Sequence, residues 1–144
     1  MAEAILNYRG KPRFKAYSAG SHPTGKVRPE AIRELEAAHL PTADARSKSW
    51  DEFTGSAAPQ MDFVFTVCDN AAKEICPVWP GQPMTAHWGI ADPAAVQGTP
   101  EEVQRAFREA FVALDRRIGL FLSLPIQSLD RLAIQTEIDR IGQQ

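Results

Sequence analysis

Two cysteines and an aspartate beside a proline are the residues of this chain best suited to chemistry. Cys68 and Cys76 lie eight positions apart, and Asp92 precedes Pro93 in a separate segment. A thiolate is a nucleophile that also forms disulfides, whereas a carboxylic acid can give a proton to a leaving oxygen. The sequence therefore offers a pair of thiols and one acid as its candidate catalytic residues.

The spacing of the two cysteines limits how they could pair. If residues 68–76 are helical, the two Cα atoms lie about 12 Å apart, at about 1.5 Å of rise per residue. A disulfide needs its Cα atoms within about 7 Å. The cysteines could therefore join only after the segment between them unwinds, and Pro77 with two alanines makes such a helix weakly anchored. A pair of this kind suits a redox switch better than a structural crosslink.

Two other interpretations of the cysteines stay open. Cysteines outside disulfides are often small buried apolar residues without chemistry. A metal site would combine Cys68 and Cys76 with His87 or His22, but structural zinc sites have four ligands and usually a closer cysteine spacing. We therefore expect no metal and no cofactor.

Asp92 would have to be shielded to act as an acid. The proline that follows it restricts its backbone. A carboxyl group whose ordinary pKa is about 3.9 donates no proton near neutral pH unless burial or a neighbouring anion favours its neutral form. Trp88 and Ile90 are the apolar neighbours that we expect to bury Asp92. An Asp-Pro turn without chemistry is the alternative.

Length and composition indicate one globular domain over residues 1–144. Apolar residues make up 44% and charged residues 24%, and the formal net charge is −2. These values are ordinary, and the charge gives no sign of nucleic-acid or membrane binding. No apolar run approaches the ~20 residues of a membrane span, and the first residues lack a secretory signal. We expect a cytoplasmic protein that binds neither nucleic acid nor membranes.

The elements that must position these residues follow from hydrophobic periodicity and helix signals. Helices are expected at residues 1–9, from 29 to about 39, from 100 to about 124, and after the capping residue Asp130. Strands are expected at residues 14–19, 61–67 and 84–88, and the second is apolar enough for a parallel strand covered on both faces. This order predicts an α/β domain with a mainly parallel sheet and right-handed crossovers.

Four motifs resemble, in order, the arsenate reductases related to low-molecular-weight protein tyrosine phosphatases. They are YSAGS at 17–21, VCDNA at 67–71, CPVWPG at 76–81 and HWGIADP at 87–93. Each motif is weak alone, but together they extend over essentially the whole chain. The resemblance implies the open, mainly parallel sheet of that family, flanked by helices.

The resemblance also implies a thiol relay. In that family an anion-loop cysteine attacks arsenate, and the residue at Cys68 then attacks that cysteine to release arsenite. The residue at Cys76 next attacks Cys68, and a thioredoxin-type partner or a small thiol reduces the resulting disulfide. The residue at Asp92 would protonate the leaving oxygen. Ala94 stands where the phosphatases place an aromatic residue that stacks on phosphotyrosine, so arsenate is the favoured substrate.

The chain departs from the family at its signature, a Cys-x5-Arg loop whose backbone N–H groups bind the oxyanion. Six residues after Cys68 is Glu74, and six after Cys76 is Gln82. The helix expected at 1–9 resembles the one that follows this loop, so we expect the first strand, the loop and the primary nucleophile to be missing. Negligible arsenate reductase activity is the consequence, together with unpaired sheet edges that favour instability, rearrangement or a dimer.

Three hypotheses accommodate this departure. The first is an arsenate reductase whose coding sequence continues upstream of Met1. The second is a short, non-catalytic paralogue that binds a partner or reports redox state. The third is a protein that binds arsenite through Cys68 and Cys76.

Overall fold

The structure is a computed structural model that describes residues 1–69, 73 and 77–144. Its helices are α1 (Ala2–Arg9), α2 (Pro29–Ala37), α3 (Pro100–Leu122) and α4 (Arg131–Gly142). Its strands are β1 (Phe63–Cys68) and β2 (Met84–Ile90). Short 3-10 turns lie at Trp50–Phe53, Pro93–Ala95 and Ile126–Ser128. The four predicted helices are therefore present, as are two of the three predicted strands.

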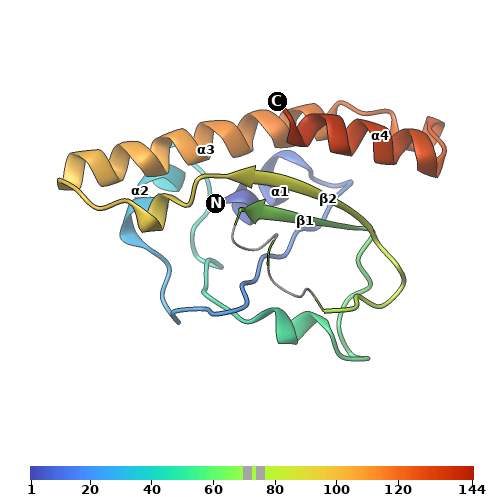
Figure 1. Cartoon of the computed structure of the whole chain (residues 1–144), viewed down its shortest axis with the longest axis horizontal. Coiled ribbons are helices and arrows are strands. Elements are labelled where there is room, and N and C mark those ends of the chain that lie inside the picture. The colour runs from blue at the N-terminus through green and yellow to red at the C-terminus, as the bar shows by residue number, and fades with distance from the viewer. Residues whose placement is uncertain (70–72, 74–76) are drawn as a thin grey trace.

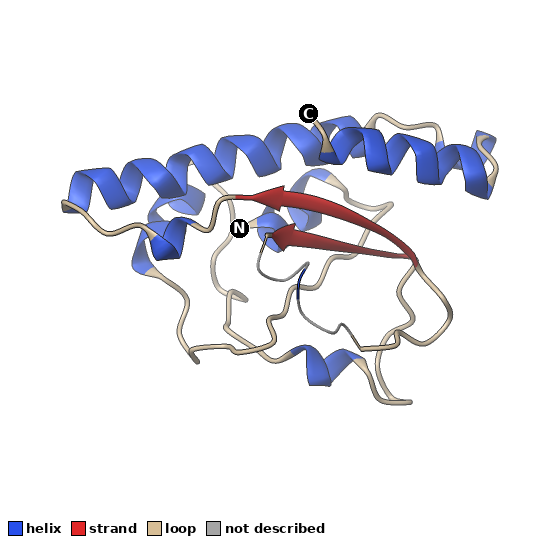
Figure 2. Ribbon diagram, in the orientation of Figure 1, coloured by secondary structure: helices blue, strands red, loops and turns tan. Residues whose placement is uncertain are grey.

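The two strands run parallel, and the predicted α/β fold with a parallel sheet flanked by helices is confirmed (Figure 2). Phe63 pairs with Met84 at the start of the ladder. Beyond Thr66 a bulge shifts the register, so that Cys68 pairs with Ile90. Bulges bend a strand and are frequent beside functional sites. Here the extra residue is on β2, where Trp88 and Gly89 oppose Val67, beside the candidate thiol.

The helices cover one face of the sheet. Helices α3 and α4 extend along that face, and α1 and α2 pack against α3 (Figure 1). Strand β2 alternates accordingly: Met84, Ala86 and Trp88 are buried, whereas Thr85 and His87 are exposed. Every residue of β1 is only partly buried, so the prediction that this strand is covered on both faces is wrong. The physical reason is that the helices in the described part of the chain pack on one face of the sheet.

The core is centred on an aromatic cluster between the sheet and α3. Phe121 is 1% exposed. Its ring contacts those of Phe14, Phe63, Phe65 and Trp88, with centroids between 5.1 and 5.9 Å away. Burying an aromatic side chain of this size contributes roughly 1.5–3 kcal/mol. The cluster therefore fixes β1, β2 and α3 relative to one another.

The strand predicted at residues 14–19 is absent. Asn7 in α1 occupies the place of a strand neighbour: Ala16 N donates to Asn7 Oδ1 at 2.7 Å, and Asn7 Nδ2 donates to Ala16 O at 3.0 Å. Just after this segment, Gly20 forms a strand-like bridge with Ser49. A strand requires a ladder of partners, and a side-chain amide satisfies a single residue.

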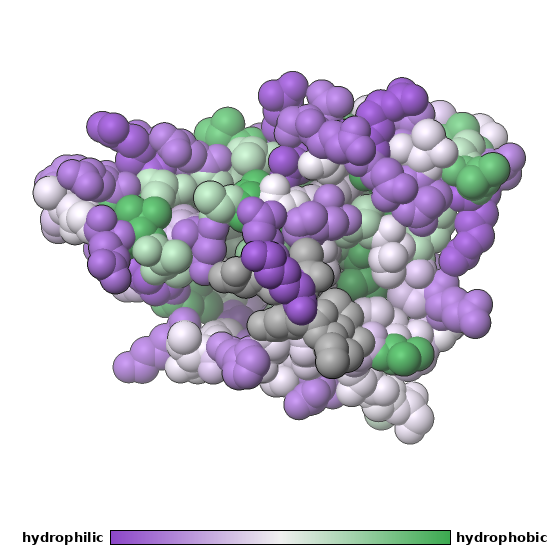
Figure 3. Space-filling model, viewed as in Figure 1, coloured by the Kyte–Doolittle hydropathy of each residue, from purple (hydrophilic) through white to green (hydrophobic). Residues whose placement is uncertain are grey.

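Helix α3 begins where its sequence signals predict. Thr99 Oγ1 accepts a hydrogen bond from Glu102 N, and Pro100 occupies the first helical position. No helix in the described part of the chain combines the length and apolarity needed to cross a membrane. The face seen in Figure 3 is largely hydrophilic, with hydrophobic residues in separate small groups.

Candidate thiol site at the end of the parallel sheet

A hollow of about 210 Å³ lies at the carboxyl end of the sheet. Cys68 and Ile90 line it from the two strand ends, and Asp92 lines it from the loop after β2. Met1 and Ala2 line it from the beginning of α1, consistent with the position of the N-terminus beside the end of β1 in Figure 1. The structure therefore brings two of the predicted site residues, Cys68 and Asp92, to one place.

The hollow combines groups of complementary chemistry. Cys68 is the last residue of β1 and is partly buried. The first-turn N–H groups of a helix carry partial positive charge, which favours anions. Helix α1 has no side-chain cap at this end. A thiol, a carboxyl group and an uncapped helix N-terminus thus share one opening.

Asp92 is not buried in the way the sequence predicted. Its side chain is exposed, and its Oδ1 accepts a hydrogen bond from Ala94 N at 2.9 Å, capping the Pro93–Ala95 turn. Trp88 cannot cover it, because its ring stacks on Phe65 at 3.9 Å on the core side of the sheet. Side chains of successive strand residues alternate between faces, and the preference of Trp88 for the core decides its direction. Of the two expected neighbours, only Ile90 lies in the same hollow.

Cys76 lies outside the described residues. Of the segment between the two cysteines, whose possible helical structure limited their pairing, only Asp69 and Lys73 are described. Asp69 Oδ1 lies 3.2 Å from His87 Nε2. The predicted pairing of Cys68 with Cys76 therefore stays a prediction.

A chain of polar side chains flanks Cys68 on the exposed face of the sheet. Thr66 Oγ1 lies 2.7 Å from His87 Nδ1, and the ring continues through Nε2 to Asp69. The sequence motifs include Asp69 and His87 in separate segments, and nothing in them indicates that the two side chains meet. Strand alternation predicts toward which face of the sheet a side chain points. The sequence does not show the cross-strand register that sets Thr66 opposite His87.

The metal alternative includes Cys76, which lies outside the described residues, so it stays untested. Among the described residues, no three His, Cys, Asp or Glu side chains gather as a metal site requires. Both ring nitrogens of His87 already lie within hydrogen-bond distance of other side chains.

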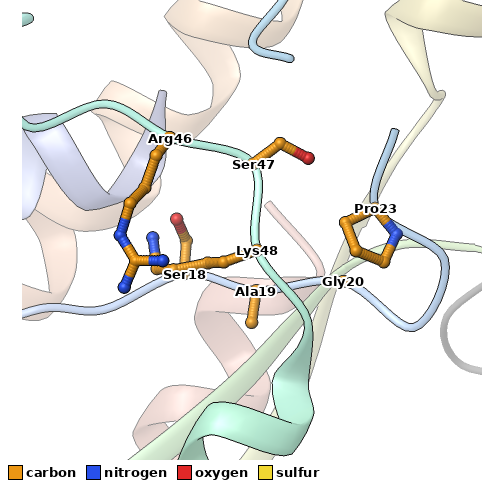
Figure 4. A pocket seen from close by; sticks show the side chains of 7 residues that line it. All are labelled: Ser18, Ala19, Gly20, Pro23, Arg46, Ser47 and Lys48. Carbon is orange, nitrogen blue, oxygen red and sulfur yellow. The ribbon is translucent and has the colours of Figure 1, made fainter. Parts of the chain in front are cut away.

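A second hollow, of about 200 Å³, adjoins the first through Ser18 (Figure 4). Its cations are already paired: Lys48 with Glu3 at 3.1 Å, and Arg46 with Glu52 at 2.7 Å. The hydrogen bond from Arg46 holds the pKa of the Glu52 carboxyl below its ordinary value. Because carboxylates neutralise both cations, this hollow has no unpaired positive charge to offer an anion.

Comparison with known proteins agrees with this architecture. Residues 1–133 match the family described as low molecular weight phosphotyrosine protein phosphatase. Arsenate reductases from Oceanobacillus iheyensis and Bacillus subtilis are 33% and 31% identical to the chain. The first alignment covers 75% of this chain and 74% of its relative, and the second covers 84% of each.

A solved structure shows the same similarity in three dimensions. The crystal structure of arsenate reductase from Archaeoglobus fulgidus superposes with a TM-score of 0.56 and is 25% identical in sequence. The superposition covers 82% of this chain and 87% of the other.

Proposed function

Because the chain belongs to the low molecular weight phosphotyrosine protein phosphatase family, we propose that it is an arsenate reductase-type protein in which Cys68 and Cys76 form the redox pair. One observation carries the proposal: Cys68 and Asp92 line the same hollow at the carboxyl ends of the two strands. Ligands of open α/β sheets bind at this edge. The similarity to arsenate reductases over most of the chain supports the same assignment.

Arsenate is favoured over phosphotyrosine by two features of the chain. Ala94 follows Asp92-Pro93, so this loop offers no aromatic ring to stack on a tyrosine substrate. A phosphatase also has no use for two thiols at these positions, whereas a reductase needs two electrons from a thiol pair.

The proposed role of Cys68 is nucleophilic. Its thiolate attacks the sulfur of an arsenic-bearing cysteine, and arsenic leaves with the electron pair of the S–As bond as arsenite. The Cys76 thiolate then attacks Cys68, releasing the first cysteine as a thiolate and forming the Cys68–Cys76 disulfide. A thioredoxin-type protein or a small thiol in the cytoplasm reduces that disulfide. In the step that precedes these, in which the first cysteine attacks arsenate and displaces one of its oxygens, Asp92 gives a proton to that leaving oxygen.

The chain offers no arsenic-bearing cysteine with the family's Cys-x5-Arg spacing, because Glu74 and Gln82 occupy the arginine positions after its two cysteines. We therefore expect the 144-residue polypeptide to release no arsenite from arsenate above background. This observation favours a second candidate function, a non-catalytic redox or arsenite-binding protein that uses the same two thiols.

The chain could also form a dimer. A second copy could pack against strand β1, which is partly exposed, and sedimentation would detect such a dimer.

The decisive experiment oxidises the purified chain and follows its thiols by intact-mass spectrometry and peptide mapping. We expect an intramolecular Cys68–Cys76 disulfide that thioredoxin and its reductase reopen. Cys68→Ser and Cys76→Ser variants are the matched controls and should form none. A parent chain that forms no such disulfide would contradict the proposal. Arsenite titration of the reduced parent and of Cys68→Ser tests the second candidate function. If the chain binds arsenite through its thiols, the variant should have a lower affinity for arsenite than the parent.

A further inference from the structure

A hydrogen-bonded chain joins the residues on both sides of Cys68 through a histidine of the neighbouring strand. Thr66 Oγ1 lies 2.7 Å from His87 Nδ1, and His87 Nε2 lies 3.2 Å from Asp69 Oδ1. A carboxylate only accepts hydrogen bonds, so His87 donates from Nε2, and in the neutral ring its Nδ1 accepts from the Thr66 hydroxyl. One ring is thereby linked to the second residue before Cys68 and to the residue after it.

The backbone around this bridge is arranged to accommodate it. The bulge that brings Cys68 into register with Ile90 is on β2, where Trp88 and Gly89 oppose Val67, inside the span of the bridge. Gly89 lies beneath the bridge, where an added Cβ would overlap His87 Nε2 and Asp69 Oδ1. Any other residue at position 89 would displace the hydrogen bond between the two.

Helix α3 holds the same part of β2 from the core side. Arg117 is buried, and its Nη1 donates to Trp88 O at 2.6 Å and to Gly89 O at 3.1 Å. The residue that leaves room for the bridge is therefore itself fixed in place. His87 lies within β2, whereas Asp69 follows the last residue of β1. The bridge thus joins the end of β1 to the strand that Arg117 binds.

We propose that His87 is a positioning residue for Cys68, and that its bridge from Thr66 to Asp69 holds the end of β1 opposite the bulge so that the thiol stays partly buried in the hollow. This role rests on the proposed function, in which Cys68 is the redox thiol.

The rate of Cys68 alkylation by iodoacetamide measures the proposed role. A Cys76→Ser background leaves Cys68 as the sole thiol, because the chain has two cysteines. A partly buried thiol reacts in proportion to how often its surroundings open locally. Exposed ion pairs contribute little, so His87→Ala and Asp69→Ala should each raise the rate about two- to fivefold. Rates are compared on the plateau of the pH profile, where the thiol is fully ionised in every variant.

Matched variants separate the bridge from general effects of charge and stability. Asp69→Asn keeps the acceptor oxygen and removes the charge, so its rate should stay near that of the parent. Asp62→Ala removes an exposed aspartate just before the opposite end of β1 and should leave the rate unchanged. If His87→Ala lowers the melting temperature, Thr66→Val is the second variant, and it should raise the rate in the same direction.

The double variant His87→Ala/Asp69→Ala provides the final test. Two residues that act through one hydrogen bond should give the double variant a rate no faster than either single one. Rates equal to the parent in both single variants would overturn the proposal. So would additive effects, an Asp69→Asn rate equal to that of Asp69→Ala, or equal acceleration by Asp62→Ala. Failure of the disulfide experiment would contradict the proposed function alone, because these rates depend on neither arsenate nor Cys76.

Discussion

A buried ion pair beside the two hollows connects α1 with the segment before the Trp50–Phe53 turn. The Lys48 side chain is 4% exposed and the Glu3 side chain 20%. Glu3 Oε2 accepts hydrogen bonds from Lys48 Nζ at 3.1 Å and from Ser18 Oγ at 2.7 Å. Burial by itself raises the pKa of the Glu3 carboxyl, but the hydrogen bonds from Ser18 and Lys48 outweigh burial, and the pKa lies below its ordinary value of 4.5. The folded state therefore favours the ionised carboxylate.

Glu3→Gln should lower the free energy of unfolding at neutral pH by about 1–3 kcal/mol, because a buried ammonium loses its charged partner. A carboxyl group with a lowered pKa stabilises the fold above its unfolded pKa, and the contribution is lost as the pH falls through the folded pKa. The difference between parent and variant should thus shrink below pH 4.5, as measured by urea denaturation across pH. Glu52→Gln, in an exposed pair with Arg46, is the control and should lower stability much less than Glu3→Gln, because solvent screens an exposed ion pair. Equal losses in both variants would contradict this role for Glu3.

Among the elements, α4 shows how a local signal and a tertiary contact combine. Asp130 Oδ1 accepts a hydrogen bond from Ala133 N at 2.7 Å and caps the first turn. Ile134, Ile138 and Ile141 are buried, as their spacing predicted. Trp88 Nε1 donates to Ile138 O at 2.9 Å, which joins the helix to β2. The cap sets where α4 begins, and the apolar stripe sets which face meets the sheet.

Asp130→Ala should lower the free energy of unfolding by about 1 kcal/mol, because the N–H of Ala133 loses its acceptor. Asp130→Asn preserves the acceptor oxygen and should change stability by only a few tenths of a kcal/mol. Urea denaturation of the three proteins measures both effects. A loss as large in the asparagine variant as in the alanine variant would show that the charge, and not the cap, is responsible.

For the whole molecule, stability depends on the contact between α3 and the two strands that carry the thiol site. The Phe121 ring lies where both strands face α3, in contact with Phe65 from β1 and Trp88 from β2. Phe65 and Trp88 also stack directly, with centroids 3.9 Å apart. Because the strands bearing Cys68 and His87 share this support, loss of the core would affect the fold and the site together.

Phe121→Ala should lower the free energy of unfolding by about 3–5 kcal/mol, since it removes a buried ring and leaves a cavity. Val112 lies on the same helix and is 60% exposed. Val112→Ala is therefore the control and should change the free energy of unfolding by less than about 0.5 kcal/mol. Thermal and urea denaturation compare the two variants. A Phe121→Ala protein as stable as the parent would contradict the assigned centre of the core.

The sequence by itself determined the features that depend on neighbouring residues. The helices at Pro29–Ala37, Pro100–Leu122 and Arg131–Gly142 follow from caps, prolines and apolar spacing, all of which act within a few residues. The two strands follow from their apolar runs. Their position before Cys68 and Asp92 already indicated that both residues lie at the carboxyl edge of a parallel sheet.

Only the tertiary structure decided which distant groups meet. It placed Asn7 against residues 14–19 in place of a strand neighbour, and it turned Trp88 into the core and away from Asp92. It also connected Thr66 with His87, which lie 21 positions apart in the sequence. The physical reason is that strand register and side-chain direction result from packing the whole core, and local sequence does not specify that packing.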